Sequence, residues 1–184
     1  MQNKKTAAIL HGYGDGPASF WYPYLKNELE KKGYEVWLPL LPNTNNPNWE
    51  DQSNFILQNF KFTEDTVLIG HSIGSPLILA VLEKAPIKIK QAILVAGTIN
   101  HFPELPKVSI KESFDWEKIK SNVQDIIFIN SDNDPWGFDD KEGKLMYDKL
   151  GGTLIIMSGE AHMGSDKFNQ PYKEFPFLLN LIKD

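Results

Sequence analysis

The apolar residues of this chain fall into short continuous runs that alternate with segments of helical spacing. The short runs predict buried strands at residues 6–11, 34–39, 66–71, 91–97, 125–131 and 152–158. The segments with helical spacing predict helices at residues 19–33, 48–60, 75–84, 141–151 and 171–182. Strands that are continuously apolar, rather than alternating, are typical of a parallel sheet covered on both faces. The pattern therefore predicts an α/β fold with a doubly wound, mainly parallel six-stranded sheet.

The handedness of their connections limits how these strands can be ordered, because crossovers between parallel strands are right-handed. With the second strand outside the first and the third strand on its other side, the order is 2-1-3-4-5-6, which is the order we predict. Ligands of such sheets bind beyond the carboxyl ends of the strands, where the order reverses. Two glycine-rich loops lie at that point, HGYGDGP (11–17) and GHSIGS (70–75). A length of 184 residues suits a single domain, 1–184.

The segment Gly70-His71-Ser72-Ile73-Gly74 has the form G-x-S-x-G and lies between a predicted buried strand and a predicted apolar helix. In that context the pattern indicates a nucleophile elbow, a sharp turn that exposes the serine hydroxyl. The glycines remove side chains that would collide with neighbouring strands. The alternative is an ordinary strand–turn–helix in which Ser72 only caps the helix. The context favours the catalytic interpretation.

A serine hydroxyl is a weak nucleophile without a base, and the chain has four histidines. His11 and His71 lie at or within glycine-rich loops, where we expect each to hydrogen-bond the loop backbone. His101 follows the fourth predicted strand, and its position does not exclude it. His162 follows the last strand, and only His162 satisfies the chain order serine, acid, histidine. We therefore predict His162 as the base, with His101 as the alternative.

The acid of such a triad orients the imidazole and stabilises its cationic form. Asp132 and Asp134 both follow the fifth predicted strand, in the segment SDNDPWG. Aspartate, asparagine and proline also favour turns, so one carboxylate can serve the turn and the other the triad. Asp134 precedes Pro135, which favours an extended conformation and so fixes the direction of Asp134.

Backbone amides are the candidate donors to a developing oxyanion. Ile73 follows the serine at the start of the predicted helix, and Tyr13 lies just past the first strand. The loop around Tyr13 could instead be a dinucleotide-binding turn. That alternative fails because the third glycine of its pattern falls at Pro17, and because the second strand ends WLPLLP, without an acidic residue to hold a ribose.

These segments together resemble the family of small α/β-hydrolases that includes retinoblastoma-binding protein 9 and bacterial serine hydrolases of about this length. The resemblance covers the whole chain and is carried by ILHGYGDGPASFWYPYLKNEL, VWLPLLPNTNNPNWEDQ, LIGHSIGS, SDNDPWG and GEAHMG. It implies a minimal α/β-hydrolase fold. It also implies that Ser72 is the nucleophile, Asp134 the acid and His162 the base.

The chain departs from the family pattern in two loops. The acid loop continues as PWGF, where the family has an apolar residue and proline, and Ala161 replaces the glycine that usually precedes the catalytic histidine. These differences bear on loop geometry and pocket shape. The retinoblastoma-binding motif of the vertebrate member needs a cysteine, and this chain has none, so that partner is not predicted.

Composition narrows the partners further. A formal net charge of −5 argues against nucleic acid, because phosphate binding needs clustered lysine and arginine. The absence of cysteine excludes a disulfide framework, a thiolate metal site and a cysteine nucleophile, and it fits a reducing compartment. The first apolar run is too short for a signal-peptide core, and no stretch approaches the roughly 18 apolar residues of a membrane span. We expect a soluble, cytoplasmic protein without a membrane partner.

Aromatic residues near the loops at the active face are candidates for an apolar acyl pocket. They are Trp21, Trp49, Phe102 and Trp136. Packing at the rim of the core is the alternative for each of them. The insert between the fourth and fifth strands is short (98–122), so we expect no large lid domain.

The sequence thus predicts an esterase-like serine hydrolase. Ser72 attacks an ester, thioester or activated amide carbonyl of a small-molecule or acyl substrate, and water then releases the acyl group; no metal or cofactor is needed. The alternative is a protein-interaction module on a hydrolase scaffold, since a fold alone does not establish function. A dehalogenase with an aspartate nucleophile is excluded because the elbow holds serine.

Overall fold

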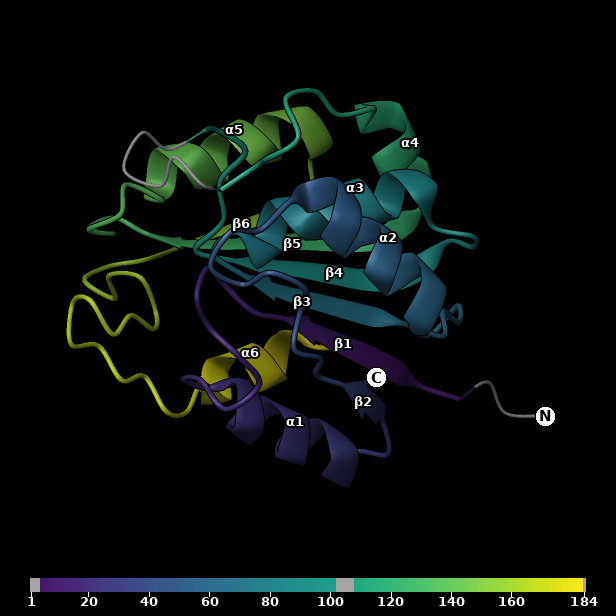
Figure 1. Ribbon diagram of the computed structural model, residues 1–184, viewed down its shortest axis with the longest axis horizontal. Helices are drawn as coiled ribbons and strands as arrows, with labels where there is room; N and C mark the ends of the chain where they lie inside the picture. Colours follow the sequence, from purple (N-terminus) through teal and green to yellow (C-terminus); the bar gives the residue numbers. More distant parts are fainter. Residues whose placement is uncertain (1–3, 102–107, 184) are drawn as a thin grey trace.

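The strands form one parallel sheet in the order β2-β1-β3-β4-β5-β6 (Figure 1). This computed structural model describes residues 4–101 and 108–183. The strands are β1 (Thr6–Leu10), β2 (Glu35–Trp37), β3 (Val67–His71), β4 (Ile89–Val95), β5 (Val123–Ser131) and β6 (Thr153–Met157). Every neighbouring pair runs parallel. The predicted fold class and strand order are confirmed.

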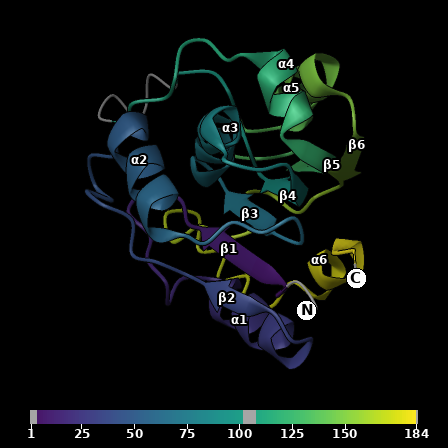
Figure 2. The same cartoon turned by 90° about the vertical axis from the view of Figure 1, so that its right-hand side faces the viewer.

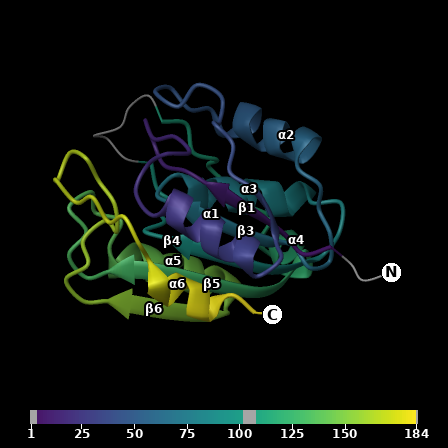
Figure 3. The ribbon, with the colours of Figure 1, turned by 90° about the horizontal axis from the view of Figure 1, so that it is seen from below.

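Helices cover both faces of the sheet (Figure 2). One face carries α1 (Tyr22–Lys31) and α6 (Pro176–Leu181), which lie in front of the sheet in Figure 3. The other face carries α2 (Trp49–Asn59), α3 (Gly74–Lys84), α4 (Trp116–Ser121) and α5 (Asp140–Leu150). Among the described residues, no helix combines the length and apolar character that crossing a bilayer requires.

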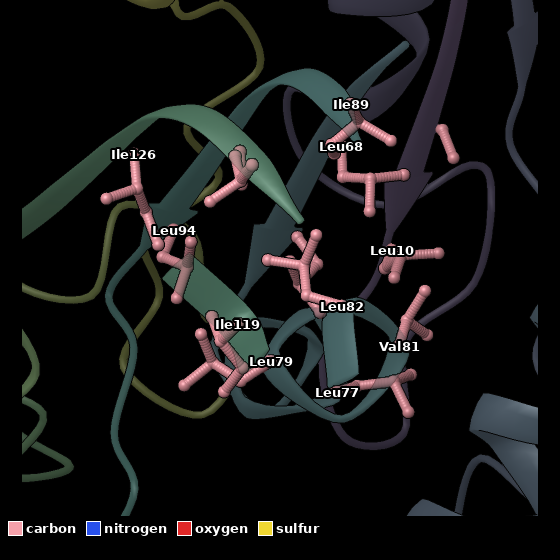
Figure 4. Close-up of a cluster of buried hydrophobic side chains, with 14 of the residues drawn as sticks. Leu10, Leu68, Leu77, Leu79, Val81, Leu82, Ile89, Leu94, Ile119 and Ile126 are labelled. Atoms are coloured by element: carbon pink, nitrogen blue, oxygen red, sulfur yellow. The ribbon is translucent and has the colours of Figure 1, made fainter. Parts of the chain in front are cut away.

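Successive residues of each strand enter two different hydrophobic cores. On β1, Ala8 and Leu10 pack into the core beneath α2 and α3, whereas Ala7 and Ile9 pack into the core beneath α1 and α6. Figure 4 shows the first core, where side chains of α3 such as Leu82 meet those of the strands. Both faces of a strand are therefore removed from water, which explains why the strands are continuously apolar.

Two helices are shorter than the sequence pattern predicts. α1 begins at Tyr22 instead of residue 19, because Phe20 has a φ of 45°, outside the right-handed helical region. The closing helix was expected at 171–182 but spans Pro176–Leu181. Pro176 starts it because proline suits the first helical turn and disfavours helical geometry in the residue before it.

The sequence pattern missed α4 (Trp116–Ser121) entirely. Asp115 caps it, and its carboxylate accepts a hydrogen bond from the backbone N–H of Lys118 at 2.9 Å. A helix of 6 residues is too short to show an apolar period.

The loops that follow β1, β3, β5 and β6 gather at the carboxyl edge of the sheet, at the left of Figure 1. Ser72, Asp132, Asp134 and His162 lie in these loops, whereas the alternative base His101 lies in the loop after β4.

Candidate active site

Ser72 lies at the apex of the turn between β3 and α3, with a φ of 55°. A positive φ is uncommon for a residue with a side chain, so the surrounding hydrogen bonds must hold it. The backbone N–H of Ser72 donates to the carbonyl of Val95 at 2.9 Å, and Ser75 N–H donates to the Ser72 carbonyl at 3.0 Å. The turn is thus fixed to β4 on one side and to the first turn of α3 on the other.

The two glycines of this turn leave no room for side chains. A Cβ on Gly70 would lie 2.5 Å from the carbonyl oxygen of Gly74, and a Cβ on Gly74 would lie 2.3 Å from the carbonyl oxygen of Leu10. The start of α3 therefore packs directly on the backbones of β3 and β1. This close approach brings Ser72 next to the loop that follows β1.

A short hydrogen bond joins His162 and Asp134. Nδ1 of His162 donates to Oδ2 of Asp134 at 2.6 Å, and both side chains are buried. The second carboxylate oxygen of Asp134 accepts a hydrogen bond from the backbone N–H of Trp136 at 2.8 Å. Two hydrogen bonds thus fix the direction of the Asp134 carboxylate, and the carboxylate fixes the imidazole.

Asp132 has a different role. Its carboxylate accepts a hydrogen bond from the backbone N–H of Gly159 at 2.8 Å, which holds the pKa of Asp132 below its ordinary value. The side chain is exposed and ties the loop after β5 to the loop after β6. Of the two aspartates that the sequence left open, only Asp134 contacts His162.

The backbone around His162 is strained and held by side chains from outside its own turn. Ala161 and Met163 have φ values of 48° and 53°. Ala161 therefore adopts a conformation that a glycine at this position, usual in the family, would adopt without strain. The amide oxygen of Gln170 accepts hydrogen bonds from the N–H groups of His162 and Gly164 at 3.1 and 3.2 Å. Sequence reasoning missed Gln170, because no spacing rule links it to a histidine eight residues earlier in the same loop.

His71 and His11 make the structural hydrogen bonds that their positions predict. Nε2 of His71 donates to the backbone carbonyl of His162 at 2.8 Å, and burial lowers the pKa of His71 to about 3. Nδ1 of His11 donates to the Gly12 carbonyl at 2.9 Å, while its Nε2 accepts from Leu41 N–H at 3.0 Å. Burial likewise lowers the pKa of His11. Both rings are therefore neutral, and His71 directly supports the main chain of His162.

Ser72 and His162 line one cavity of about 340 Å³. Its walls are formed by the loop after β1, the serine turn, the loop after β5 and the loop after β6. The lining residues are Tyr13, Gly14, Asp15, Phe20, Ser72, Trp136, Phe138, His162, Ser165, Asp166 and Lys167. The cavity thus combines aromatic walls with a few charged groups, which suits a small ligand with an apolar part.

Of the predicted pocket residues, Trp136 lines this cavity, but Trp21 and Trp49 do not. Trp21 is fully buried in the core, where its indole N–H donates to the carbonyl of Met163 at 2.9 Å. Trp49 starts α2 and borders a separate narrow crevice with Ile73. Sequence position brought both tryptophans near the loops but could not give the direction of their side chains. Phe102 lies outside the described residues.

Tyr13 lines the same cavity as Ser72, and Ile73 follows Ser72 in the chain. Tyr13 belongs to the loop after β1, and Ile73 immediately precedes the first residue of α3. N–H groups at a helix start lack partners within the helix and carry partial positive charge. The two main-chain segments that the sequence singled out are therefore both adjacent to the cavity that Ser72 lines.

Comparison with known proteins agrees with this geometry. The sequence model of the serine hydrolase family matches residues 7–181. YdeN of Bacillus subtilis (strain 168) is 31% identical over 135 residues, which cover 71% of this chain and 71% of YdeN. Serine hydrolase RBBP9 of Rattus norvegicus is 26% identical over 179 residues, covering 92% of this chain and 93% of that protein. The crystal structure of the B. subtilis ydeN gene product superposes with a TM-score of 0.85 at 25% identity, covering 96% of each chain.

The fold and these matches place the chain in a defined class, the α/β-hydrolases. Within that class it belongs to the serine hydrolase family.

Proposed function

We propose that this serine hydrolase cleaves carboxylic esters, thioesters or activated amides through an acyl-enzyme, with Ser72, His162 and Asp134 as its triad. The observation that carries the proposal is the buried 2.6 Å hydrogen bond between His162 and Asp134, beside the cavity that both His162 and Ser72 line. Asp134 accepts a hydrogen bond from His162 Nδ1–H, which leaves Nε2 of the ring to act as the base.

In the first step Ser72 Oγ bonds to the substrate carbonyl carbon while His162 Nε2 takes the hydroxyl proton. The carbonyl oxygen becomes an oxyanion, which the backbone N–H groups of Tyr13 and Ile73 stabilise. The intermediate then expels the alcohol, thiol or amine, which takes the proton from His162. In the second step water, deprotonated by His162, attacks the acyl-enzyme and releases the carboxylic acid and Ser72.

The cavity supports a small-molecule or acyl substrate. Its volume of about 340 Å³ lies at the lower end of ordinary ligand pockets. Trp136, Phe138 and Phe20 supply aromatic surface on its walls, consistent with an apolar acyl or alcohol group. A cytoplasmic location stays a prediction from composition.

A labelling experiment with a fluorophosphonate probe tests the proposal, because the probe reacts only with an activated serine. We expect stoichiometric labelling and hydrolysis of p-nitrophenyl esters, with a preference for short acyl chains. Absence of both would favour the alternative of an interaction module. Comparing esters of increasing chain length with aminoacyl esters would define the substrate class.

The two aspartates give a matched pair of variants. We expect Asp134→Asn to lower turnover by about 10⁴, because an amide that donates to Nδ1 imposes the wrong histidine tautomer. Asp132→Asn retains turnover and lowers the melting temperature only slightly, because its carboxylate is exposed and holds one backbone N–H. Turnover and thermal melting are measured side by side. If Asp132→Asn is the inactive variant, the acid is misassigned.

A further inference from the structure

A carboxyl group that the proposed mechanism does not use lies beside the nucleophile. Asp15, in the loop after β1, lines the same cavity as Ser72 and His162. Asp15 and Ser72 both lie against Gly12. A Cβ added to Gly12 would lie 2.7 Å from Asp15 Oδ2 and 3.2 Å from Ser72 Cβ, so the carboxyl group and the serine are close to each other. An ionised carboxylate here would place negative charge near the developing oxyanion.

Asp15 is the first member of a hydrogen-bonded chain that ends at the backbone of His162. Oδ2 of Asp15 lies 3.1 Å from the hydroxyl of Tyr22, and this hydroxyl lies 2.7 Å from Nδ1 of His71. Nε2 of His71 lies 2.8 Å from the carbonyl oxygen of His162. The chain crosses from the loop after β1 through α1 and β3 to the loop after β6.

Counting the available protons shows which group donates in each hydrogen bond of this series. A carbonyl oxygen only accepts, so Nε2 of His71 carries a proton and donates to His162. Because the ring of His71 is neutral, its Nδ1 has no proton and must accept from Tyr22. Burial keeps the pKa of Tyr22 well above its ordinary value, so Tyr22 has one hydroxyl proton, which His71 uses. A hydrogen bond between Asp15 and Tyr22 then requires the carboxyl to be the donor.

We propose that Asp15 is a positioning residue that acts in its protonated form, donating to Tyr22 so that Tyr22 and His71 together hold the main chain of His162. This inference rests on the proposed function, in which His162 is the base. When Asp15 loses its proton to solvent, its carboxylate competes with His71 Nδ1 for the single proton of Tyr22. His71 then loses one of its two hydrogen bonds, and negative charge lies beside Ser72.

The surroundings of Asp15 place this change near neutral pH. Burial raises the pKa of Asp15 to about 6, and the nearby charge of Asp166 acts in the same direction. The Tyr22 hydroxyl and the positive charge that His162 can carry act in the opposite direction. Lys167 also lines the cavity, with its ammonium 4.2 Å from the centre of the Trp136 ring.

The remaining titratable groups, His11 and His162, lie near His71 at the other end of the hydrogen-bonded series. His71 lies close enough to His11 and His162 for a charge on either ring to lower the pKa of His71 further. The neutral form of His71 therefore persists across the pH range in which Asp15 ionises, and the direction of the hydrogen bonds depends on Asp15.

The variant Asp15→Asn tests the proposal, because its amide donates to Tyr22 at every pH. The second-order rate of fluorophosphonate labelling is measured from pH 5 to 8. Below the midpoint of Asp15 ionisation, we expect the ratio of the variant rate to the wild-type rate to stay near its value at pH 5. By pH 8 the ratio should rise about threefold to tenfold, which is the effect expected for the loss of one hydrogen bond in the wild type. Asp166→Asn removes a carboxylate from the same cavity without a link to Tyr22. Because the charge of Asp166 raises the pKa of Asp15, this variant should keep the wild-type form of the pH dependence, with its midpoint moved to lower pH.

A spectroscopic measurement separates this proposal from the proposed function. The measurement is made in the Ser72→Ala variant, because it needs no enzymatic activity. The ¹⁵N resonance of His71 Nδ1 should shift with pH, with a midpoint near pH 6. This shift should be absent when Asp15→Asn or Tyr22→Phe is added. A His71 resonance that is insensitive to Asp15, or a proton found on Nδ1 at pH 5, would overturn the proposal. So would a flat ratio of labelling rates. Failure of the wild type to label would instead contradict the proposed function, and the His71 shift would still decide whether the proton chain exists.

Discussion

Replacing Ser72 by alanine is expected to abolish fluorophosphonate labelling and to lower ester turnover by up to the order of 10⁶. The residue lies at the apex of the elbow and lines the cavity, and its backbone hydrogen bonds do not involve the hydroxyl. Alanine retains those backbone contacts, so the fold should persist. The remaining rate would come from the oxyanion donors and from substrate binding alone.

A neighbouring serine provides the control for this variant. Ser75 is buried in the first turn of α3, and its hydroxyl donates to the Gly70 carbonyl at 3.2 Å. We expect Ser75→Ala to lower the melting temperature but to retain labelling, since this hydroxyl is directed at the backbone. Full labelling of Ser72→Ala would show that another side chain is the nucleophile.

Replacing His162 by alanine is expected to cost nearly as much turnover as the loss of Ser72, because the members of a triad act as a unit. The truncation also leaves the Asp134 carboxylate buried without its partner, which lowers stability. His162→Gln therefore serves as a second variant, because its amide can still donate to a carboxylate. Both variants should hydrolyse esters at a small residual rate, and thermal melting distinguishes lost chemistry from lost folding.

His101→Ala is the matched histidine control. His101 is exposed, and it does not line the cavity formed by the described residues. We expect this variant to retain most activity. An inactive His101→Ala together with an active His162→Ala would move the base to the loop after β4.

The central strands were predictable from sequence because burial on both faces makes them continuously apolar, whereas the edge strands β2 and β6 are partly exposed and were marked by short apolar runs. The handedness of the crossovers limited the possible strand orders, and the predicted order, which is the observed one, brings the serine turn and the first loop together. The helices were less predictable at their ends, since proline at 176 and the positive φ of Phe20 override an apolar period that continues past them.

The proposed acid could be narrowed by sequence to Asp132 and Asp134. Their contacts separate the two, since Asp132 accepts from Gly159 N–H and Asp134 accepts from His162. Trp21 shows that sequence position does not give the direction of a side chain. Trp21 lies close to the site in the sequence, yet its side chain is buried in the core, where its indole N–H donates to the carbonyl of Met163. Side-chain direction in an irregular segment depends on backbone angles that no period in the sequence encodes. The same is true of Gln170, which holds the His162 turn from a loop without regular structure.

The contacts that hold the His162 loop join parts of the chain that are far apart in sequence. Trp21 and Met163 are 142 positions apart, and His71 and His162 are 91 apart. Loop-closure entropy makes such contacts late events in folding. During synthesis β1, β3, α3 and β4 emerge before the segment after β6, which carries His162, the proposed base. With His162 as the proposed base, a growing chain would carry Ser72 without that base until it is almost complete, and we expect hydrolysis only from a molecule that has finished folding.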